Sequence, residues 1–368
     1  MNDKGRAETY LAAVRGLPRP YPLMDIHAHP FELFFSSPSY TQVDPVPGLY
    51  TSDGTSYQVP TVSDAASLDD DLRRKAAALF TRPALARQSL TRLYRHTGPY
   101  VFEAQMRLSG IDRVLLLPVS HSLDHMQQQM ATMKAMFGGR DDQFLFGWCV
   151  SNDVLEKDIH VSLREAVRHH GISAVKLHPN LCRIEPKVPA GRNRIEAILD
   201  ACGRLVLPLV VHGGTSPLSG ERGLPDCAIV ENLDKINWSL SPSAVIIAHA
   251  GAYGATPNEI ETKVLPLLLK MLDRHSNLFA DLSGLDTACL FQILSRVNPE
   301  RLLFGSDMLY ESQWAAVVRL LHTLHRVSYH PEELFLRIAG ENIWKHILGN
   351  KTGGRRESSY SQSHPRRI

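Results

Sequence analysis

Two histidines separated by one residue, His27 and His29, have the type and the spacing to bind a single metal ion. Successive side chains of a β-strand point to opposite faces, so residues two apart share a face and their imidazoles can converge on one ion. By itself the pair is weak evidence, because His-x-His also occurs by chance and a histidine near a strand end is often a hydrogen-bonded core residue. Its meaning depends on which other residues the fold brings beside it.

Further side chains that can bind metal or move protons stand at the ends of other short apolar runs: Lys176, His178, His212, His249 and Asp307. In a barrel of parallel strands the carboxyl ends of all strands face one mouth, so residues scattered along the chain meet in space. Several imidazoles with one carboxylate and one lysine match the nitrogen and oxygen ligands of zinc, manganese or iron. Taken singly, each histidine is more often a structural residue than a ligand.

The elements that would position these residues are a series of short apolar runs that end in polar or glycine residues. Continuous runs rich in β-branched residues are typical of strands buried on both faces of a parallel sheet. The runs are Leu23–His27, Ile111–Val119, Phe144–Val150, Ile172–Leu177, Leu207–Val211, Ala244–Ala248, Leu278–Leu282 and Leu302–Gly305.

Stretches with helical spacing, the first of them stopped by Gly171, lie between the later runs: Leu155–His170, Arg194–Leu205, Ile260–Arg274, Cys289–Val297 and Glu311–His325. Alternating strands and helices form right-handed βαβ units, and eight of them close into a (β/α)8 TIM barrel. We therefore predict an α/β fold of this kind, distorted by a long insertion. The main rival, a doubly wound open sheet, would carry a glycine-rich phosphate loop where this chain has His27-Ala28-His29-Pro30.

The spacing of these elements divides the chain into a barrel, an insertion and a tail. We expect residues 1–350 to form a single domain, with residues 31–100 inserted after the first strand and helical from about Leu68 to His96. An insertion at this point lies over the catalytic mouth, where it acts as a lid or specificity element or forms an oligomer contact. Residues 351–368 are rich in Gly, Ser and Arg without periodicity and are expected to be a disordered tail.

The composition is that of a soluble globular protein, with 43% hydrophobic and 21% charged residues among 368. A net charge of +2 gives no electrostatic reason to expect a nucleic acid partner. The polar N-terminus lacks an apolar signal region and no run of about eighteen apolar residues follows, so we expect a cytoplasmic protein without a membrane partner. Five cysteines without Cys-x-x-Cys spacing argue against a disulfide framework and a thiolate metal site.

In their order along the chain these motifs resemble the amidohydrolase superfamily, in the branch that includes aminocarboxymuconate semialdehyde decarboxylase. The match runs from about Leu23 to Leu348 and leaves the insertion and the tail uncovered. The matching segments are Asp25-Ile26-His27-Ala28-His29, Lys176-Leu177-His178-Pro179, Val211-His212-Gly213-Gly214, Ala248-His249-Ala250-Gly251, Gly305-Ser306-Asp307 and Gly340-Glu341-Asn342-Ile343.

The resemblance implies a role for most of the strand-end residues. The metal would be bound by His27, His29, His212 and Asp307, and Asp307 would also act as the base on a metal-bound water. His249 would be the catalytic histidine of a one-metal site or a ligand in a two-metal site. The implied cofactor is one or two divalent ions, with zinc expected first and manganese or iron as alternatives.

Lys176 and His178 leave the number of metal ions and the substrate contacts open. A Lys176 carboxylated by CO2 would bridge two metals, whereas an ordinary ammonium group would pair with a substrate carboxylate. His178 shares a face with Lys176 and is expected to contact the substrate or to make a structural hydrogen bond. Arg183 and Arg222 could also bind a carboxylate, although solvated loop arginines are commoner. We expect a small, carboxylated substrate and a homodimer.

Two reactions suit this residue set. Hydrolysis of an ester, lactone or amide requires an activated water, whereas decarboxylation or hydration of an unsaturated or aromatic acid requires the metal to hold the substrate. We favour hydrolysis, with Asp307 and His249 as proton-transfer groups, because Lys176 permits the two-metal arrangement and hydrolases are the broader part of the superfamily. The intact residue set disfavours a barrel that binds a ligand without turnover. Asp281 and Ser283, at the end of the seventh strand, are assigned no chemistry.

Overall fold

The computed structural model describes residues 6–30, 67–74, 99–120, 122–216, 226–308 and 310–348 of the chain. Its centre is one sheet of eight parallel strands, in which each strand pairs with the next along the chain. The strands are β1 (Met24–Ala28), β2 (Arg113–Leu116), β3 (Phe144–Cys149), β4 (Ala174–Leu177), β5 (Leu209–Val211), β6 (Val245–Ile247), β7 (Leu278–Asp281) and β8 (Leu302–Leu303).

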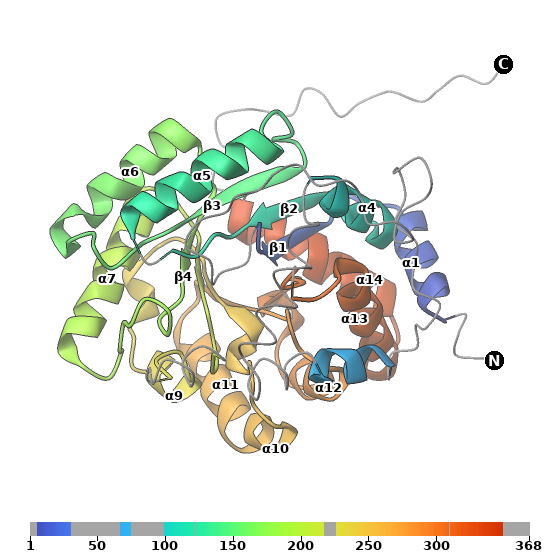
Figure 1. Cartoon of the computed structure of the whole chain (residues 1–368). Helices are drawn as coiled ribbons and strands as arrows, with labels where there is room; N and C mark the ends of the chain where they lie inside the picture. The colour runs from blue at the N-terminus through green and yellow to red at the C-terminus, as the bar shows by residue number, and fades with distance from the viewer. Residues whose placement is uncertain are drawn as a thin grey trace.

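The first and last strands meet and close the sheet into a barrel. The backbone N–H of Ile26 donates to the carbonyl of Phe304 at 3.1 Å, and that of Asp307 donates to the carbonyl of His27 at 2.8 Å. Helices surround the strands in Figure 1. The (β/α)8 TIM barrel predicted from the eight apolar runs is confirmed.

The helical stretches expected from the sequence are present, with ends that shift by a few residues. Gly171, expected to stop a helix, is the left-handed C-cap of α6 with φ 62°. The α-helices are α1 (Arg6–Gly16), α4 (Pro99–Ser109), α5 (Leu123–Phe137), α6 (Ile159–His170), α7 (Pro189–Arg204), α9 (Val230–Leu233), α10 (Pro257–Glu259), α11 (Leu265–Arg274), α12 (Thr287–Leu294), α13 (Gln313–Val327) and α14 (Pro331–Leu336). Short 3-10 or π segments are η2 (Glu156–Asp158), η3 (Trp238–Leu240), η4 (Ala248–Gly251), η5 (Ile260–Val264), η6 (Pro299–Arg301), η7 (Arg337–Glu341) and η8 (Ile343–Leu348).

Strand β2 is shorter than the apolar run Ile111–Val119 that predicted it. The ladder stops before Pro118, which has no N–H to donate. The carbonyl of Leu117, just beyond the strand, instead accepts a hydrogen bond from His29 Nδ1 at 2.8 Å. The end of this run therefore orients a site residue rather than extending the sheet.

Side chains along the strands alternate between two apolar layers. Ala174, Val210 and Phe279 pack in the barrel interior, whereas the next residue of each strand packs between the sheet and the helices. The residue after that returns to the interior at the carboxyl end of the strand, because the side-chain period of a strand is two. These interior residues at the mouth are Lys176, His212 and Asp281.

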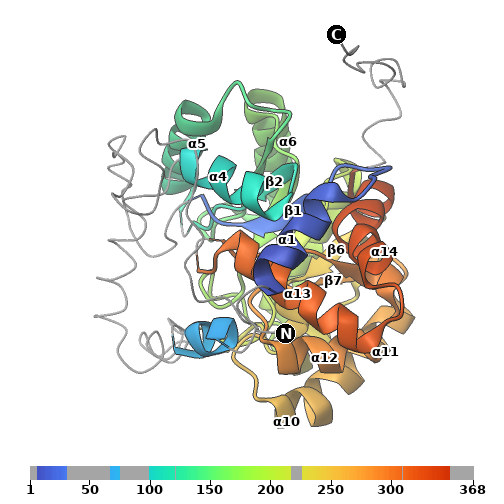
Figure 2. The ribbon, with the colours of Figure 1, turned by 90° about the vertical axis from the view of Figure 1, so that its right-hand side faces the viewer.

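Helix α1 precedes the barrel and was not expected from the sequence, because its apolar residues follow no clear helical stripe. It lies across α13 in Figure 2, where the rings of Tyr10 and His325 are 5.3 Å apart. This contact places α1 on the outside of the barrel, away from the mouth.

Several predictions fall on residues that the structure does not describe. Arg222, the tail at 351–368 and the insertion apart from residues 67–74 and 99–100 lie outside the described ranges. Residues 67–74 are helical, as expected for that stretch. Within the described ranges, no helix combines the length and the apolar character needed to cross a bilayer.

Candidate metal centre at the barrel mouth

His27, His29 and Asp307 meet at the mouth of the barrel and are buried. Asp307 Oδ1 lies 3.1 Å from His29 Nε2 and 3.7 Å from His27 Nε2. One ligand atom from each residue lies within 4.8 Å of the other two. The structure therefore brings together three of the four residues expected to bind the metal.

The orientation of His29 indicates that this group fits a cation. Its Nδ1 donates to the carbonyl of Leu117, so a neutral His29 presents the lone pair of Nε2 to Asp307 Oδ1. A lone pair facing a carboxylate is repulsive unless a second proton or a metal ion lies between them. Two imidazole nitrogens and a carboxylate oxygen are ligands that a divalent transition metal accepts.

His27 is held in a matching orientation by Asp281, a strand-end carboxylate to which no chemistry was assigned from the sequence. Asp281 Oδ2 accepts from His27 Nδ1 at 3.0 Å, while Oδ1 accepts from the backbone N–H groups of His249 and Ser283, each at 3.0 Å. Burial alone would raise the pKa of Asp281, but the interactions with His27 and His249 hold it well below its usual range. Asp281 thus fixes the tautomer of His27 and leaves Nε2 for a ligand.

Asp281 can also be counted in a second group of possible metal ligands, with His27 and His249. Both of its oxygens already accept hydrogen bonds, which favours an orienting role. The sequence identified Asp281 by the same signal as the other residues, a polar residue two positions after interior Phe279 at the end of an apolar strand, but not its role.

Lys176 reaches the same place from β4. Its Nζ lies 2.8 Å from His27 Nε2 and donates to the lone pair that a metal would use. Burial lowers the pKa of Lys176 to about 8, although Asp281 and Asp307 act in the opposite direction. The structure brings Lys176 into the centre as expected, whereas its carboxylation stays a prediction.

His249 follows β6 in a strained turn. It has φ 56° and the next residue, Ala250, has φ 50°, both in the left-handed region that non-glycine residues rarely occupy. Its Nδ1 lies 3.0 Å from the carbonyl of Ser283, which can only accept, so Nδ1 carries the proton and Nε2 is a base. Its ring lies 5.0 Å from that of His27, which puts it beside the candidate metal ligands.

Asp307 carries a charge at the mouth and is placed by close backbone packing. Burial would raise its pKa, but a hydrogen bond with His29 and the neighbouring His249 hold it well below its usual range. It has φ 60° and follows Gly305, where a Cβ would lie 2.7 Å from the Cβ of His27. Only glycine lets β8 approach β1 this closely.

A bulge in β1 and a buried carboxylate hold the ligand loop. The ladder with β2 shifts register between Asp25 and Ala28, as bulges beside active sites do. Asp25 accepts from the backbone N–H and the hydroxyl of Ser306 and from Gln313 Nε2 at 2.9 Å. These bonds tie β1 to the segment that carries Asp307.

His178 and His212 form a separate pair on the other side of the mouth. Their rings stack 3.9 Å apart with planes 11° from parallel, and the ring of His212 lies 5.0 Å from that of His249. His212 Nε2 donates to the carbonyl of Thr215 at 2.9 Å. Burial and neighbouring basic groups lower the pKa of both histidines well below the usual value.

The roles expected for His212 and His178 both stay predictions. Within the described residues, neither group of possible metal ligands includes His212, so its role as third imidazole ligand stays a prediction. His178 stays a predicted substrate contact. Arg183 lies on the exposed loop after β4 with φ 51°.

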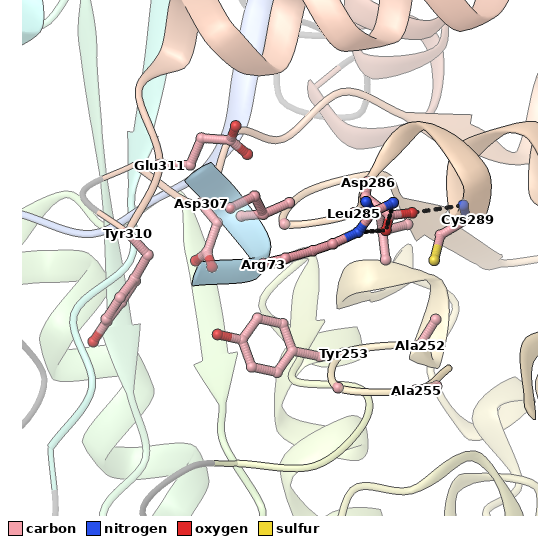
Figure 3. Close-up of a pocket in the computed structure, with 13 residues that line it drawn as sticks. Arg73, Ala252, Tyr253, Ala255, Leu285, Asp286, Cys289, Asp307, Tyr310 and Glu311 are labelled. Atoms are coloured by element: carbon pink, nitrogen blue, oxygen red, sulfur yellow. Dashed lines mark hydrogen bonds and ion pairs between the residues drawn. The ribbon is translucent and has the colours of Figure 1, made fainter. Parts of the chain in front are cut away.

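A cavity of about 250 Å³ opens against Asp307. Figure 3 shows Tyr253 and Tyr310 on one side of it and the side chain of Arg73 crossing toward Asp286. The ring of Tyr253 lies 4.8 Å from that of His249. Asp307 therefore borders an aromatic-walled space, and His249 lies behind one of its walls, against Tyr253.

Several solved structures share the barrel fold of this chain. No curated protein sequence matches the chain. A 2,6-dihydroxybenzoate decarboxylase structure superposes with TM-score 0.56 at 13% identity, covering 89% of this chain and 99% of that one. The manganese-containing 5-carboxyvanillate decarboxylase of Novosphingobium aromaticivorans gives 0.52 at 14%, covering 89% and 97%.

A zinc-containing amidohydrolase of Burkholderia multivorans gives a TM-score of 0.52 at 12% identity, covering 89% of this chain and 99% of that one. At these identities the three likenesses concern the fold. The sequence itself matches the model of one family, described as Amidohydrolase, over residues 24–343. This range contains every strand of the barrel and all the residues of the candidate centre, so the chain belongs to the amidohydrolase family.

Proposed function

We propose that this chain is a metal-dependent, non-oxidative decarboxylase of an aromatic or unsaturated carboxylic acid. The observation that carries the proposal is the cavity against Asp307, which has two tyrosines in its wall and Arg73 at its edge. Its volume is below the range of about 300–1,000 Å³ typical of drug-sized ligands and suits a single-ring acid. Two of the similar structures are decarboxylases of aromatic acids. This ranking reverses the order expected from the sequence, in which hydrolysis came first.

The residues that would hold the ion are His27, His29 and Asp307, with His212 as the proposed further ligand. A divalent ion bound there would polarise and orient the oxygen atoms of the substrate. Zinc and manganese both suit these ligands, and each is present in one of the similar structures. Homodimerisation stays a prediction, which light scattering of the purified protein would test.

His249 would move the proton that decarboxylation requires. Its Nε2 is a base in the tautomer fixed by Ser283, so it can take the proton of a ring hydroxyl. The protonated imidazole then gives this proton to the ring carbon that bears the carboxylate, and the carbon–carbon bond to CO2 breaks. Lys176, whose Nζ lies beside His27 Nε2, and His178, on the other side of the mouth, would orient the substrate carboxylate.

Hydrolysis is the second candidate, because Lys176 lies at His27 and His249 Nε2 can equally accept a proton from water. This reading needs a carboxylated Lys176 and two metal ions per chain. Intact-protein mass spectrometry under non-denaturing conditions measures both. One ion per chain and an unmodified lysine would remove the two-metal hydrolase.

The reaction is tested by incubating the metal-loaded protein with a panel of hydroxybenzoates, unsaturated acids, lactones and esters. Decarboxylation predicts one CO2 per substrate consumed and, in D2O, one deuterium on the carbon that lost the carboxylate. His249→Asn should abolish both the CO2 release and the deuterium incorporation. His330→Asn, the same change at an exposed histidine, is the control and should leave both unchanged. Hydrolysis of a lactone or ester without CO2 release from any acid would overturn the proposal.

A further inference from the structure

The described helix of the insertion, residues 67–74, is attached to the barrel through a buried carboxylate. Figure 1 shows this light-blue helix beside α12. Asp69 is only 3% exposed, and its oxygens accept from the backbone N–H of Thr287 at 3.1 and 3.2 Å and from the hydroxyl of Thr287. Thr287 is the first residue of α12, so Asp69 satisfies a backbone donor that the helix itself leaves free.

Arg319 of α13 holds the same carboxylate from the other side. Its side chain is buried, with Nε 3.8 Å from Asp69 Oδ1 and Nη2 paired with the carboxylate of Glu311. Its Nη1 also donates to the carbonyl of Leu68 at 3.4 Å. Burial lowers the pKa of Arg319 to about 10, so it remains charged at neutral pH. A buried cation without its carboxylate partners is strongly unfavourable.

The inserted helix and Glu311, which both contact Arg319, also line the cavity that opens against Asp307. Leu72 and Arg73, three and four residues after Asp69, line the cavity, and so does Glu311. The backbone N–H of Glu311 donates to the carbonyl of Asp307 at 3.3 Å. Arg319 therefore lies between the inserted helix and the loop that carries a predicted metal ligand.

We propose that Asp69 is a positioning residue of the substrate cavity, which clamps residues 67–74 over the mouth by its buried pairing with Arg319 and Thr287. Besides this clamp, the helix is held by Leu68, which is buried in the hydrophobic core, and by the pair of Arg73 with Asp286, in which Arg73 is half exposed. Exposed pairs contribute little to stability. The clamp thus determines whether Leu72 and Arg73 form part of the cavity wall.

Cys289 gives a direct readout of the clamp that needs no substrate. It lines the cavity and is only 6% exposed, and all five cysteines of the chain are buried and free. In metal-loaded, full-length Asp69→Asn, the rate of iodoacetamide labelling at Cys289, measured by peptide mass spectrometry, is expected to rise about tenfold or more. Thr287→Val, which removes only the hydroxyl donor, should raise it by a smaller factor.

Matched variants separate opening of the clamp from unfolding. Asp70→Asn makes the same chemical change on the same helix, at a side chain that is 80% exposed, and should label as slowly as the wild type. Cys289→Ser should remove the fast-labelling peptide. Unfolding would expose all five thiols, whereas an open clamp exposes Cys289 before the other four. Slow labelling of Cys289 in both folded Asp69→Asn and Thr287→Val would overturn the proposal.

The effect on substrate rests on the proposed function. With the acid that the decarboxylase assay identifies, Asp69→Asn should raise KM about tenfold and change kcat less than about threefold, with metal content unchanged. Fast labelling of Cys289 with an unchanged KM would overturn the assignment of the helix to the substrate cavity. Fast labelling in a protein that decarboxylates no acid would support the clamp while overturning the decarboxylase.

Discussion

The two sides of the barrel mouth differ in how their histidines are held. On the side formed by β7, β8 and β1, which we call the carboxylate side, His27 and His29 face Asp281 and Asp307. On the basic side, formed by β4 and β5, His178 and His212 stack on each other. His249, in the turn after β6, stands between the two.

This difference suits the two sides of the mouth to two different tasks, metal binding and substrate binding. On the carboxylate side, acceptors fix the Nδ1 atoms of both imidazoles and direct their Nε2 atoms toward Asp307. On the basic side, burial and Lys176 keep the histidines neutral, and the lysine offers the positive charge that an anionic group requires. We infer that the carboxylate side binds the metal, with His212 as a further ligand, and that Lys176 and His178 bind the substrate carboxylate.

Asp307→Asn should have the largest effect, because it removes the charge that balances the ion on the carboxylate side. An ion contributes several kcal/mol to transition-state stabilisation, so kcat/KM is expected to fall about 10⁴-fold. Bound metal, measured by plasma mass spectrometry after dialysis, should fall with it. A variant that keeps a full complement of metal would break the assignment of Asp307 as a ligand.

His249→Asn tests the residue between the two sides. Loss of a general acid–base group should lower kcat about 10³-fold while metal content stays at the wild-type value. Steady-state kinetics and metal analysis on the same preparation check both. If the metal were lost instead, His249 would belong to the carboxylate side as a ligand of a second ion.

Asp281→Asn tests whether Asp281 orients His27 for metal binding. Partners of this kind change metal affinity by about 10–100-fold, because the imidazole loses its fixed tautomer. Competition with a fluorescent chelator measures the dissociation constant. An unchanged constant would mean that Asp281 serves the fold rather than the metal.

His178→Leu probes the basic side and should have the smallest effect. Losing one hydrogen bond to a charged substrate group is expected to raise KM about tenfold, with metal affinity unchanged. The carboxylate side would then be unaffected. A loss of metal in this variant would contradict the separation of the two sides.

The sequence predicts the barrel and most residues of the mouth because both depend on short, local patterns. Apolar runs followed by a polar residue identified β4, β5 and β6 with Lys176, His212 and His249. Parallel strands then place such residues together without further information. The His-x-His spacing likewise predicted that both imidazoles share a face, and the Nε2 atoms of both lie near Asp307 Oδ1.

What the sequence did not predict depends on tertiary contacts. Asp281 ends its strand like the other residues, but its partnership with His27 follows from the closure of β8 onto β1. Asp69 and Arg319 are 250 residues apart in the sequence and pair only because the inserted helix folds back onto α13. Neither pairing has a local signature.

The most direct test is a crystal structure of the protein loaded with manganese, with data collected at the manganese absorption edge. We predict one anomalous peak, coordinated by His27 Nε2, His29 Nε2 and a carboxylate oxygen of Asp307, with His212 as a further ligand. A peak held by His178 and His212 without the three residues of the carboxylate side, or no peak in a folded and manganese-saturated crystal, would contradict this prediction.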